Sequence, residues 1–247
     1  MTNRATKPSK SRAHILAHYF TGGNGREFDT YRNPELYDRG SHSRLYRRGN
    51  LARGVADVVE QHLSNERPAH ILDVGAGTGI LTLELARRGH VVTGVDLFAE
   101  QLGRLKFKAE MLGRTAQIQT VQCDMNEGLP FRDEQFSTVV SLRATRYIRS
   151  FTRWLNEVER VLEPGGGFIL PAFAVDAIPW RRHSELGWRQ PTSANSMMGT
   201  VEDAGLSVDQ GASGKYGHIV DQSLGERDVP FYYSPTFIVA EKPPQQP

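Results

Sequence analysis

The chain is poor in cysteine and in long apolar runs. Its 247 residues include one cysteine, Cys123, which excludes an internal disulfide and a cysteine-based zinc or iron–sulfur cluster within one chain, and we expect no metal site. No apolar run approaches the roughly 20 residues that a membrane-spanning helix needs. Residues 1–12 are basic and polar and lack the apolar segment of a secretory signal. These absences predict a cytoplasmic protein without a membrane span.

Charge is distributed unevenly along the chain. A composition of 38% hydrophobic and 23% charged residues is typical of a soluble globular protein, and the length fits one α/β domain with additions. Residues 1–53 contain eleven Lys or Arg and four Asp or Glu, a net charge of +7, whereas the remainder holds 19 basic and 24 acidic residues. A basic arm of this kind indicates a nucleic-acid or anionic partner, or a solvated, partly disordered leader.

Strands and helices alternate from residue 51 onward. Apolar periodicity predicts helices over 12–20, 51–63, 81–88, 98–112, 151–162 and 196–204. It predicts strands over 69–74, 91–96, 118–123, 138–142, 168–173, 207–212 and 236–241, with the run Pro164–Gly167 ending the helix before the fifth strand. Such alternation with short loops favours a doubly wound, mostly parallel α/β sheet with helices on both faces.

The expected organisation has three parts. Residues 1–50 form a basic N-terminal arm and helical lid, and residues 51–241 form the main domain, in which residues 174–235 are a substrate-pocket insert. Residues 242–247, rich in Pro and Gln, form a disordered tail. Trp180, Trp188, Met197 and Met198 either line the substrate pocket or pack in the core.

The most informative stretch is Ile71-Leu72-Asp73-Val74-Gly75-Ala76-Gly77-Thr78-Gly79. Its first part is an apolar run that suits a strand covered on both faces. The glycines that follow allow a tight turn whose backbone approaches a ligand with no Cβ in the way. Glycines are also common in the turns that follow strands, so this turn alone only suggests a nucleotide-like ligand.

Carboxylates follow three consecutive predicted strands, at Asp73, Asp96 and Asp124. In a doubly wound sheet, ligands bind beyond the carboxyl ends of the strands. Asp96 is placed to accept hydrogen bonds from both hydroxyls of a ribose. Asp124 could accept one from an exocyclic amine such as that of adenine, beside the backbone N–H of Met125. Each acid has a structural interpretation as a strand-end or cap residue, but three in succession favour a binding site.

The ordered motifs resemble those of the class I S-adenosylmethionine-dependent methyltransferases, in particular the small-molecule branch that includes the ubiquinone and menaquinone methyltransferases. The resemblance covers about residues 50–173 and is carried by these segments: Asp73–Gly79, Val95-Asp96, Cys123-Asp124-Met125, Leu129-Pro130-Phe131, Phe136 with Val139-Val140, and Leu162–Gly166. It implies a Rossmann-like sheet of seven strands with an antiparallel last strand, and S-adenosylmethionine as cofactor, with S-adenosylhomocysteine as product.

The same resemblance implies the cofactor residues. The turn Gly75–Gly79 would pass the methionine part, Asp96 would bind the ribose, and Asp124 and Met125 would lie at the adenine ring. The full set expected to bind the cofactor is Asp73, Gly75, Ala76, Gly77, Thr78, Gly79, Asp96, Leu97, Cys123, Asp124, Met125 and Leu142.

The chain departs from the family pattern at two places; the first removes a structural acid with little expected effect, and the second bears on catalysis. Ser137 follows Phe136 where relatives often have Asp, and Arg146 and Tyr147 stand where many relatives have a His pair. The arginines of this segment either point to solvent or to glutamates such as Glu157, or one of them, Arg143 or Arg146, holds a substrate carboxylate or phosphate bidentately. The catalytic candidates are Arg146, Tyr147, His18 and Tyr37, each of which could also serve only in packing or on the surface.

The predicted function is methyl transfer to an O, N or C atom of a small-molecule acceptor. An anionic acceptor and a homodimer are further hypotheses. RNA methylation through the basic arm is an alternative, and so is a non-catalytic protein that retains cofactor binding. A nicotinamide dehydrogenase fits less well, because its turn is usually G-x-G-x-x-G and the later motifs have no role in it.

Overall fold

The structure is a computed structural model that describes residues 33–35, 50–63, 68–142, 144–173, 194–213 and 235–244. Its helices are α5 (Asn50–His62), α6 (Ile80–Arg87), α7 (Ala99–Met111), α8 (Phe151–Val161) and α10 (Ala194–Asp203), with short 3-10 turns η1 (Thr115–Gln117) and η2 (Thr145–Tyr147). Its strands are β1 (His70–Val74), β2 (Val91–Asp96), β3 (Ile118–Gln122), β4 (Phe136–Val140), β5 (Leu162–Phe173), β6 (Ser207–Val208) and β7 (Pro235–Glu241).

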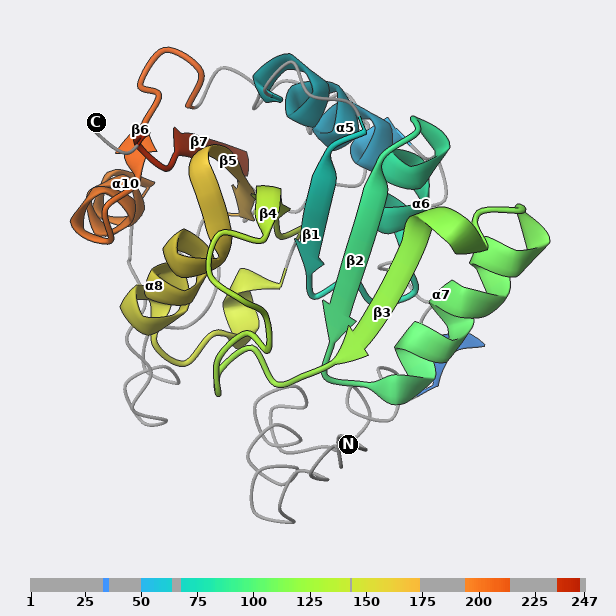
Figure 1. Ribbon diagram of the computed structural model, residues 1–247. Helices are drawn as coiled ribbons and strands as arrows, with labels where there is room; N and C mark the ends of the chain where they lie inside the picture. Colours follow the sequence, from blue (N-terminus) through green and yellow to red (C-terminus); the bar gives the residue numbers. More distant parts are fainter. Residues whose placement is uncertain are drawn as a thin grey trace, which may run out of the picture.

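The strands form one seven-stranded sheet in the order β3-β2-β1-β4-β5-β7-β6 (Figure 1). Strands β1 to β5 are parallel, and β7 runs antiparallel to both of its neighbours, β5 and β6. The predicted fold class, including the reversed last strand, is confirmed. The chain order changes direction at β1, which has β2 on one side and β4 on the other, and this is where ligands bind in such sheets.

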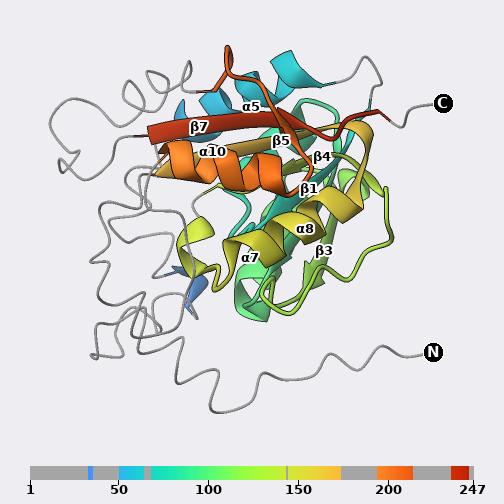
Figure 2. The same ribbon diagram turned by 90° about the vertical axis from the view of Figure 1, so that its left-hand side faces the viewer.

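Helices cover both faces of the sheet. On one face, Val55 of α5 and Leu85 of α6 are fully buried in a core with β1 and β7. Leu105 of α7 lies on the same face, because it and Thr82 of α6 both surround Gly94 of β2. On the other face α8 and α10 lie side by side, as Figure 2 shows, and their core includes Trp154. On each of these helices, apolar residues recur at helical spacing, and their burial supplies the main driving force for the fold.

Helix α8 shows how the sequence encodes one of these contacts. Its apolar residues recur at intervals of one, three or four, and all are buried: Phe151, Trp154, Leu155, Val158 and Val161. Trp154 packs against Phe168 of β5 with ring centroids 5.8 Å apart. The helix begins after Ser150 and ends at Val161, so the next residue enters β5 directly.

Several predicted boundaries were wrong. The strand expected over 138–142 is β4, Phe136–Val140, two residues earlier. The run from Pro164 to Gly167 does not separate α8 from β5 but belongs to β5, because Leu162 is buried and pairs with Phe136 across an irregular register. The weak strand expected over 207–212 is limited to Ser207–Val208. The predicted stripe on α7 also fails at its end, since Leu112 is 62% exposed.

The described residues add contacts to two parts of the expected organisation. Within the expected insert 174–235, the described residues 194–213 belong to the main fold: α10 packs on α8, and β6 pairs with β7. Met197 is 3% exposed and is a core residue rather than a pocket wall. Lys242, the first residue of the expected tail, exchanges backbone hydrogen bonds with Gly165 and Gly166, and its ammonium pairs with Glu159 at 3.1 Å.

Other predictions lie outside the described residues. They are the helix over 12–20, nearly all of the arm over 1–50, and Trp180 and Trp188. Among the described helices, none combines the length and the apolarity needed to cross a bilayer.

Candidate cofactor site

The glycine turn after β1 is held against the end of β2. The backbone N–H groups of Gly75 and Ala76 both donate to the Val95 carbonyl at 2.9 Å. Gly75, Gly77 and Gly79 have φ values of +79°, +54° and +85°, a region that side chains with a Cβ rarely adopt. A Cβ on Gly75 would lie 2.3 Å from Cβ of Ala144. The sequence therefore needs glycine here both for the backbone conformation and for the close approach of the segment after β4.

Asp73 lies beneath this turn and is 2% exposed. Its Oδ2 accepts a hydrogen bond of 2.6 Å from the Thr82 hydroxyl on α6. Burial raises the pKa of Asp73 from 3.8 to about 6, the Thr82 hydroxyl offsets part of that rise, and the charge of Asp96 adds to it. The bond to Thr82 fixes the start of α6 relative to β1.

Asp96, at the end of β2, is oriented by two backbone donors. Gly77 N donates to its Oδ2 and Phe98 N to its Oδ1, each at 2.9 Å. Burial raises the pKa of Asp96, and the bonds from Phe98 and Gly77 partly oppose the rise. The backbone N–H of Leu97 also acts on this carboxylate. Because a carboxylate offers about four lone-pair sites, these backbone donors still leave acceptor capacity for a hydroxyl of a ligand.

Asp124 follows β3 and is the third carboxylate at this edge, with a side chain 17% exposed. Its Oδ1 accepts two hydrogen bonds of 3.0 Å from Asn126, one from the backbone N–H and one from Nδ2. Its Oδ2 lies 3.6 Å from Nη2 of Arg149. Met125, next in the chain, is partly buried against the core.

Cys123 lies between Asp96 and Asp124. Its backbone N–H donates to the Asp96 carbonyl at 3.1 Å, which joins the ends of β2 and β3. Burial raises the pKa of the Cys123 thiol from 9.0 to about 12, and the two carboxylates add to the rise. The thiol is therefore protonated at neutral pH and unsuited to nucleophilic chemistry.

A small cavity of about 30 Å³ lies at the turn, and five of the predicted residues are among those that line it: Asp73, Gly75, Ala76, Thr78 and Leu142. The carbonyl of Leu97, which follows Asp96, accepts a hydrogen bond from the Gln122 side chain. The structure thus brings together the turn and the three strand ends, as the sequence predicted for a parallel sheet.

The predicted catalytic residues are less well placed. Tyr147 is partly buried at the end of η2, and its carbonyl accepts a hydrogen bond of 3.1 Å from Asn126 Nδ2. The backbone of Arg146 lies in the same turn, but its side chain is outside the described part, as are Arg143, His18 and Tyr37. Their predicted roles stay predictions.

The residues present fit S-adenosylmethionine. The positive φ angles and the short Gly75 to Ala144 approach form a backbone cradle that a Cβ would fill. Asp96 is an oriented acceptor for hydroxyls, and Asp124 presents one oxygen that receives no hydrogen bond from the described residues. This donor and acceptor set matches a nucleoside with an attached polar chain.

Comparison with known proteins agrees with this geometry. The family described as a methyltransferase domain matches residues 72–170. A phosphatidylethanolamine N-methyltransferase of Cereibacter sphaeroides is 31% identical over 157 residues, which span 58% of this chain and 76% of the relative. The chain belongs to the class I S-adenosylmethionine-dependent methyltransferases.

Two further matches describe how this methyltransferase relates to others. A malonyl-[acyl-carrier protein] O-methyltransferase of Enterobacter lignolyticus is 30% identical over 181 residues, covering 73% of this chain and 66% of the relative. A geranyl diphosphate C-methyltransferase from Streptomyces coelicolor, solved with S-adenosyl-L-homocysteine, shares the fold with a TM-score of 0.57 at 18% identity, over 76% of this chain and 78% of that one. The cofactor of the methyltransferase is S-adenosylmethionine.

Sequence reasoning missed three polar residues of this site. They are Asn126, Glu127 and Arg149, which join the loop after β3 to the segment after η2. The spacing of Asp124 and Asn126 is typical of a local Asx turn, and this was the available signal. The partners of Asn126 lie 21 and 23 residues further along, so only the tertiary structure reveals them.

Proposed function

We propose that this methyltransferase moves the methyl group of S-adenosylmethionine to an O, N or C atom of a small-molecule acceptor. The observation that carries the proposal is the pair of oriented carboxylates, Asp96 and Asp124, at neighbouring strand ends beside the glycine turn. Asp96 would accept from the ribose hydroxyls and Asp124 from the exocyclic amine of adenine. The turn from Gly75 to Gly79 would hold the methionine part.

The bound cofactor supplies a sulfonium methyl group that is already electrophilic. The protein then has to place the acceptor atom in line with that methyl group and keep water out, which is where most of the acceleration arises. A general base is required only for an acceptor that is protonated at the working pH. Tyr147 is a candidate, because its backbone is fastened next to Asp124 through Asn126.

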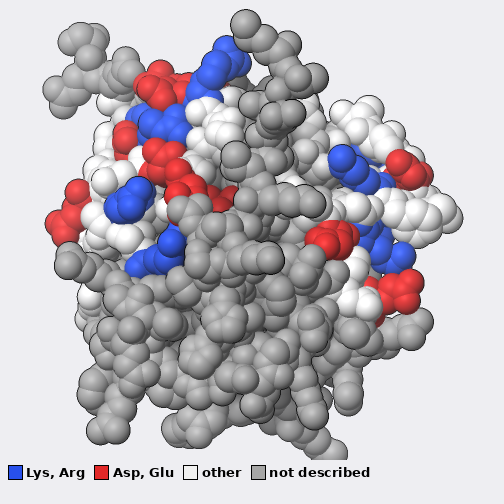
Figure 3. All heavy atoms as spheres, turned by 90° about the horizontal axis from the view of Figure 1, so that it is seen from below, with Lys and Arg blue, Asp and Glu red and all other residues white. Residues whose placement is uncertain are grey.

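Two considerations favour a small-molecule acceptor. The relatives named above act on a phospholipid and on an acyl group carried by a protein. Where the strands end, the described acidic and basic side chains are intermixed on both flanks (Figure 3), so these described residues form no basic stripe of the kind found at a nucleic-acid interface. An anionic acceptor held by Arg143 or Arg146 would fit the predicted roles of these arginines. RNA methylation rests on the basic residues before 53, nearly all outside the described part.

The test is the affinity for S-adenosylhomocysteine, measured by isothermal titration calorimetry. Replacing Asp96 by Ala removes the ribose acceptor and should raise Kd at least about tenfold, which corresponds to losing one charged hydrogen bond. Asp96→Asn keeps the size of the side chain and should show a smaller loss. Asp203→Ala is the matched control, because Asp203 is exposed on α10. Near-native affinity in Asp96→Ala would contradict the ribose assignment.

A second measurement addresses the acceptor. The protein is incubated with S-adenosylmethionine and either a panel of amines, phenols, carboxylic acids and polyprenyl diphosphates or total RNA, and release of S-adenosylhomocysteine is followed. Turnover is expected with a member of the small-molecule panel. Turnover with RNA alone would refute the proposed acceptor class and leave the cofactor assignment intact.

A further inference from the structure

We propose that Asn126 is a positioning residue for the base of the cofactor: it orients the carboxylate of Asp124 and fastens the loop after β3 to the segment after β4. The inference rests on the proposed role of Asp124 as acceptor for the adenine amino group. Asn126 itself makes no contact with the reacting atoms in this scheme.

The carboxylate of Asp124 is held by Asn126. Both hydrogen bonds to its Oδ1 come from Asn126, one from the backbone and one from Nδ2, each 3.0 Å long. Two donors on one oxygen fill its capacity. Ligand binding is therefore left to Oδ2, and rotation of the carboxylate group is blocked.

Asn126 also bridges two loops that are distant in sequence. Its Nδ2 donates to the Tyr147 carbonyl at 3.1 Å, and its Oδ1 accepts from Arg149 N at 2.7 Å. One side chain thus makes three hydrogen bonds, and two of them reach the residues that follow β4. Because Ala144 in the same segment approaches Gly75, the segment contacts both the glycine turn and the Asp124 loop.

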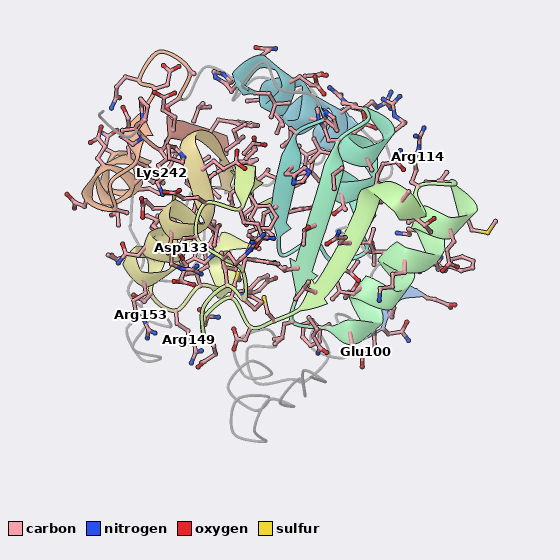
Figure 4. All side chains as sticks on the ribbon, viewed as in Figure 1. Glu100, Arg114, Asp133, Arg149, Arg153 and Lys242 are labelled. Carbon is pink, nitrogen blue, oxygen red and sulfur yellow. The ribbon has the colours of Figure 1, made fainter. Side chains whose placement is uncertain are left out.

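A positive charge, that of Arg149, lies beside Asp124. The guanidinium of Arg149 lies 2.6 Å from Oε1 of Glu127 and 3.6 Å from Oδ2 of Asp124. Its hydrogen bond is made to Glu127, so the positive charge lies close to Asp124 without occupying the oxygen that faces the ligand. Arg149 and Arg153 project near each other at this end of the molecule (Figure 4). The hydrogen bond from the Arg149 backbone N–H to Asn126 Oδ1 fixes the position of the residue that carries this charge.

The bridge borders a cleft of about 430 Å³ between the loop after β3 and helix α8. Asn126 and Asn156 both line it, which provides an internal control. Asn156 is exposed on α8, and no hydrogen bond of its side chain occurs among the described residues. Asn156→Ala therefore changes the same residue type in the same cleft without touching Asp124.

The experiment compares two ligands on four proteins by isothermal titration calorimetry. The ligands are S-adenosylhomocysteine and its analogue in which hydrogen replaces the exocyclic amino group of adenine. The proteins are the unmodified chain, Asn126→Ala, Asn126→Asp and Asn156→Ala. Asn126→Asp is isosteric and keeps the acceptor for Arg149 N, but it replaces both Nδ2 donations by repulsion with Asp124 and the Tyr147 carbonyl, so it is the stronger of the two perturbations. Urea unfolding of each variant accompanies the titrations, and the comparison of the two ligands is made on the variants that are folded.

Asn126→Ala and Asn126→Asp should raise Kd for S-adenosylhomocysteine about tenfold and Kd for the analogue less than about threefold. The difference arises because Asn126 orients Asp124 toward the exocyclic amino group of adenine, which the analogue lacks. Asn156→Ala should leave both affinities unchanged. Equal losses for the two ligands would overturn the proposal, since they would mean that Asn126 only supports the loop. Unchanged affinity in both Asn126 variants would also overturn it. Failure of the unmodified chain to bind S-adenosylhomocysteine would instead refute the proposed function.

Discussion

Replacing Gly75 by Ala tests the glycine turn most directly. Two costs should add in this variant. Alanine at φ +79° is strained by about 1–2 kcal/mol relative to an ordinary backbone conformation. Its Cβ would also lie 2.3 Å from Cβ of Ala144, an overlap that only backbone movement relieves and that costs about 1–3 kcal/mol. The expected loss in the free energy of unfolding is therefore about 2–5 kcal/mol.

Two other glycines separate these costs. Gly89 has φ +97° but nothing within 4 Å of a Cβ, so Gly89→Ala should show the conformational strain alone, about 1–2 kcal/mol. Gly103 lies in α7 with open space around it and no positive φ, so Gly103→Ala should stabilise the protein by about 0.5–1 kcal/mol.

The assay is urea unfolding followed by far-ultraviolet circular dichroism, with S-adenosylhomocysteine affinity measured on the same samples. Gly75→Ala should be the least stable of the three and should bind S-adenosylhomocysteine at least about tenfold more weakly, because the backbone that moves is the cradle itself. A stability loss no greater than that of Gly89→Ala would refute the claim that Ala144 closes on the turn. Unchanged affinity would refute the claim that this backbone touches the cofactor.

Two further predictions concern the buried titratable groups. The folded protein holds the proton of Asp73 up to about pH 6, whereas the unfolded chain releases it near pH 3.8, so this group lowers stability by up to roughly 3 kcal/mol as the pH rises between those values. Asp73→Asn should remove this decrease in stability. The free energy of unfolding of the variant minus that of the unmodified protein should therefore increase from pH 4 to pH 7. If this difference does not vary with pH, the raised pKa of buried Asp73 is contradicted. Burial also raises the pKa of Cys123 from 9.0 to about 12, so iodoacetamide at pH 8 should modify the native protein at least about tenfold more slowly than the urea-unfolded one. Because Cys123 is the single cysteine, mass spectrometry reports on it alone, and equal rates in the two states would refute the burial.

Local sequence patterns predicted most of the fold. Strand β2 was predicted at Val91–Asp96, its observed bounds, because its apolar run is flanked by Gly89 and by an acid that ends it. The prediction failed at residues 162–166, where proline and glycines suggested a loop. These residues join β5 because Leu162 is buried and Gly165 N donates to the Lys242 carbonyl, a contact between residues far apart in the chain.

The candidate site divides in the same way. The three acids and the glycine turn could be found from the sequence, because a parallel sheet brings the carboxyl ends of its strands to one edge. The spacing of Asp124 and Asn126 indicates a local turn, but the bonds of Asn126 to Tyr147 and Arg149 could not be predicted, since they depend on the folding of two separate loops. In the sequence, Asp73, Asp96 and Asp124 each follow or end a predicted strand, but their environments in the structure differ. Asp73 lies under the turn and accepts a hydrogen bond from Thr82.

The sequence by itself determined the sheet, the family and the methyl donor, because periodicity and strand-end motifs are local and occur in a fixed order. The tertiary structure decided which glycine is packed against Ala144 and how the loops after β3 and β4 are joined. Those features depend on distances of a few ångströms between residues 20 to 70 positions apart, and no local pattern in the chain encodes them.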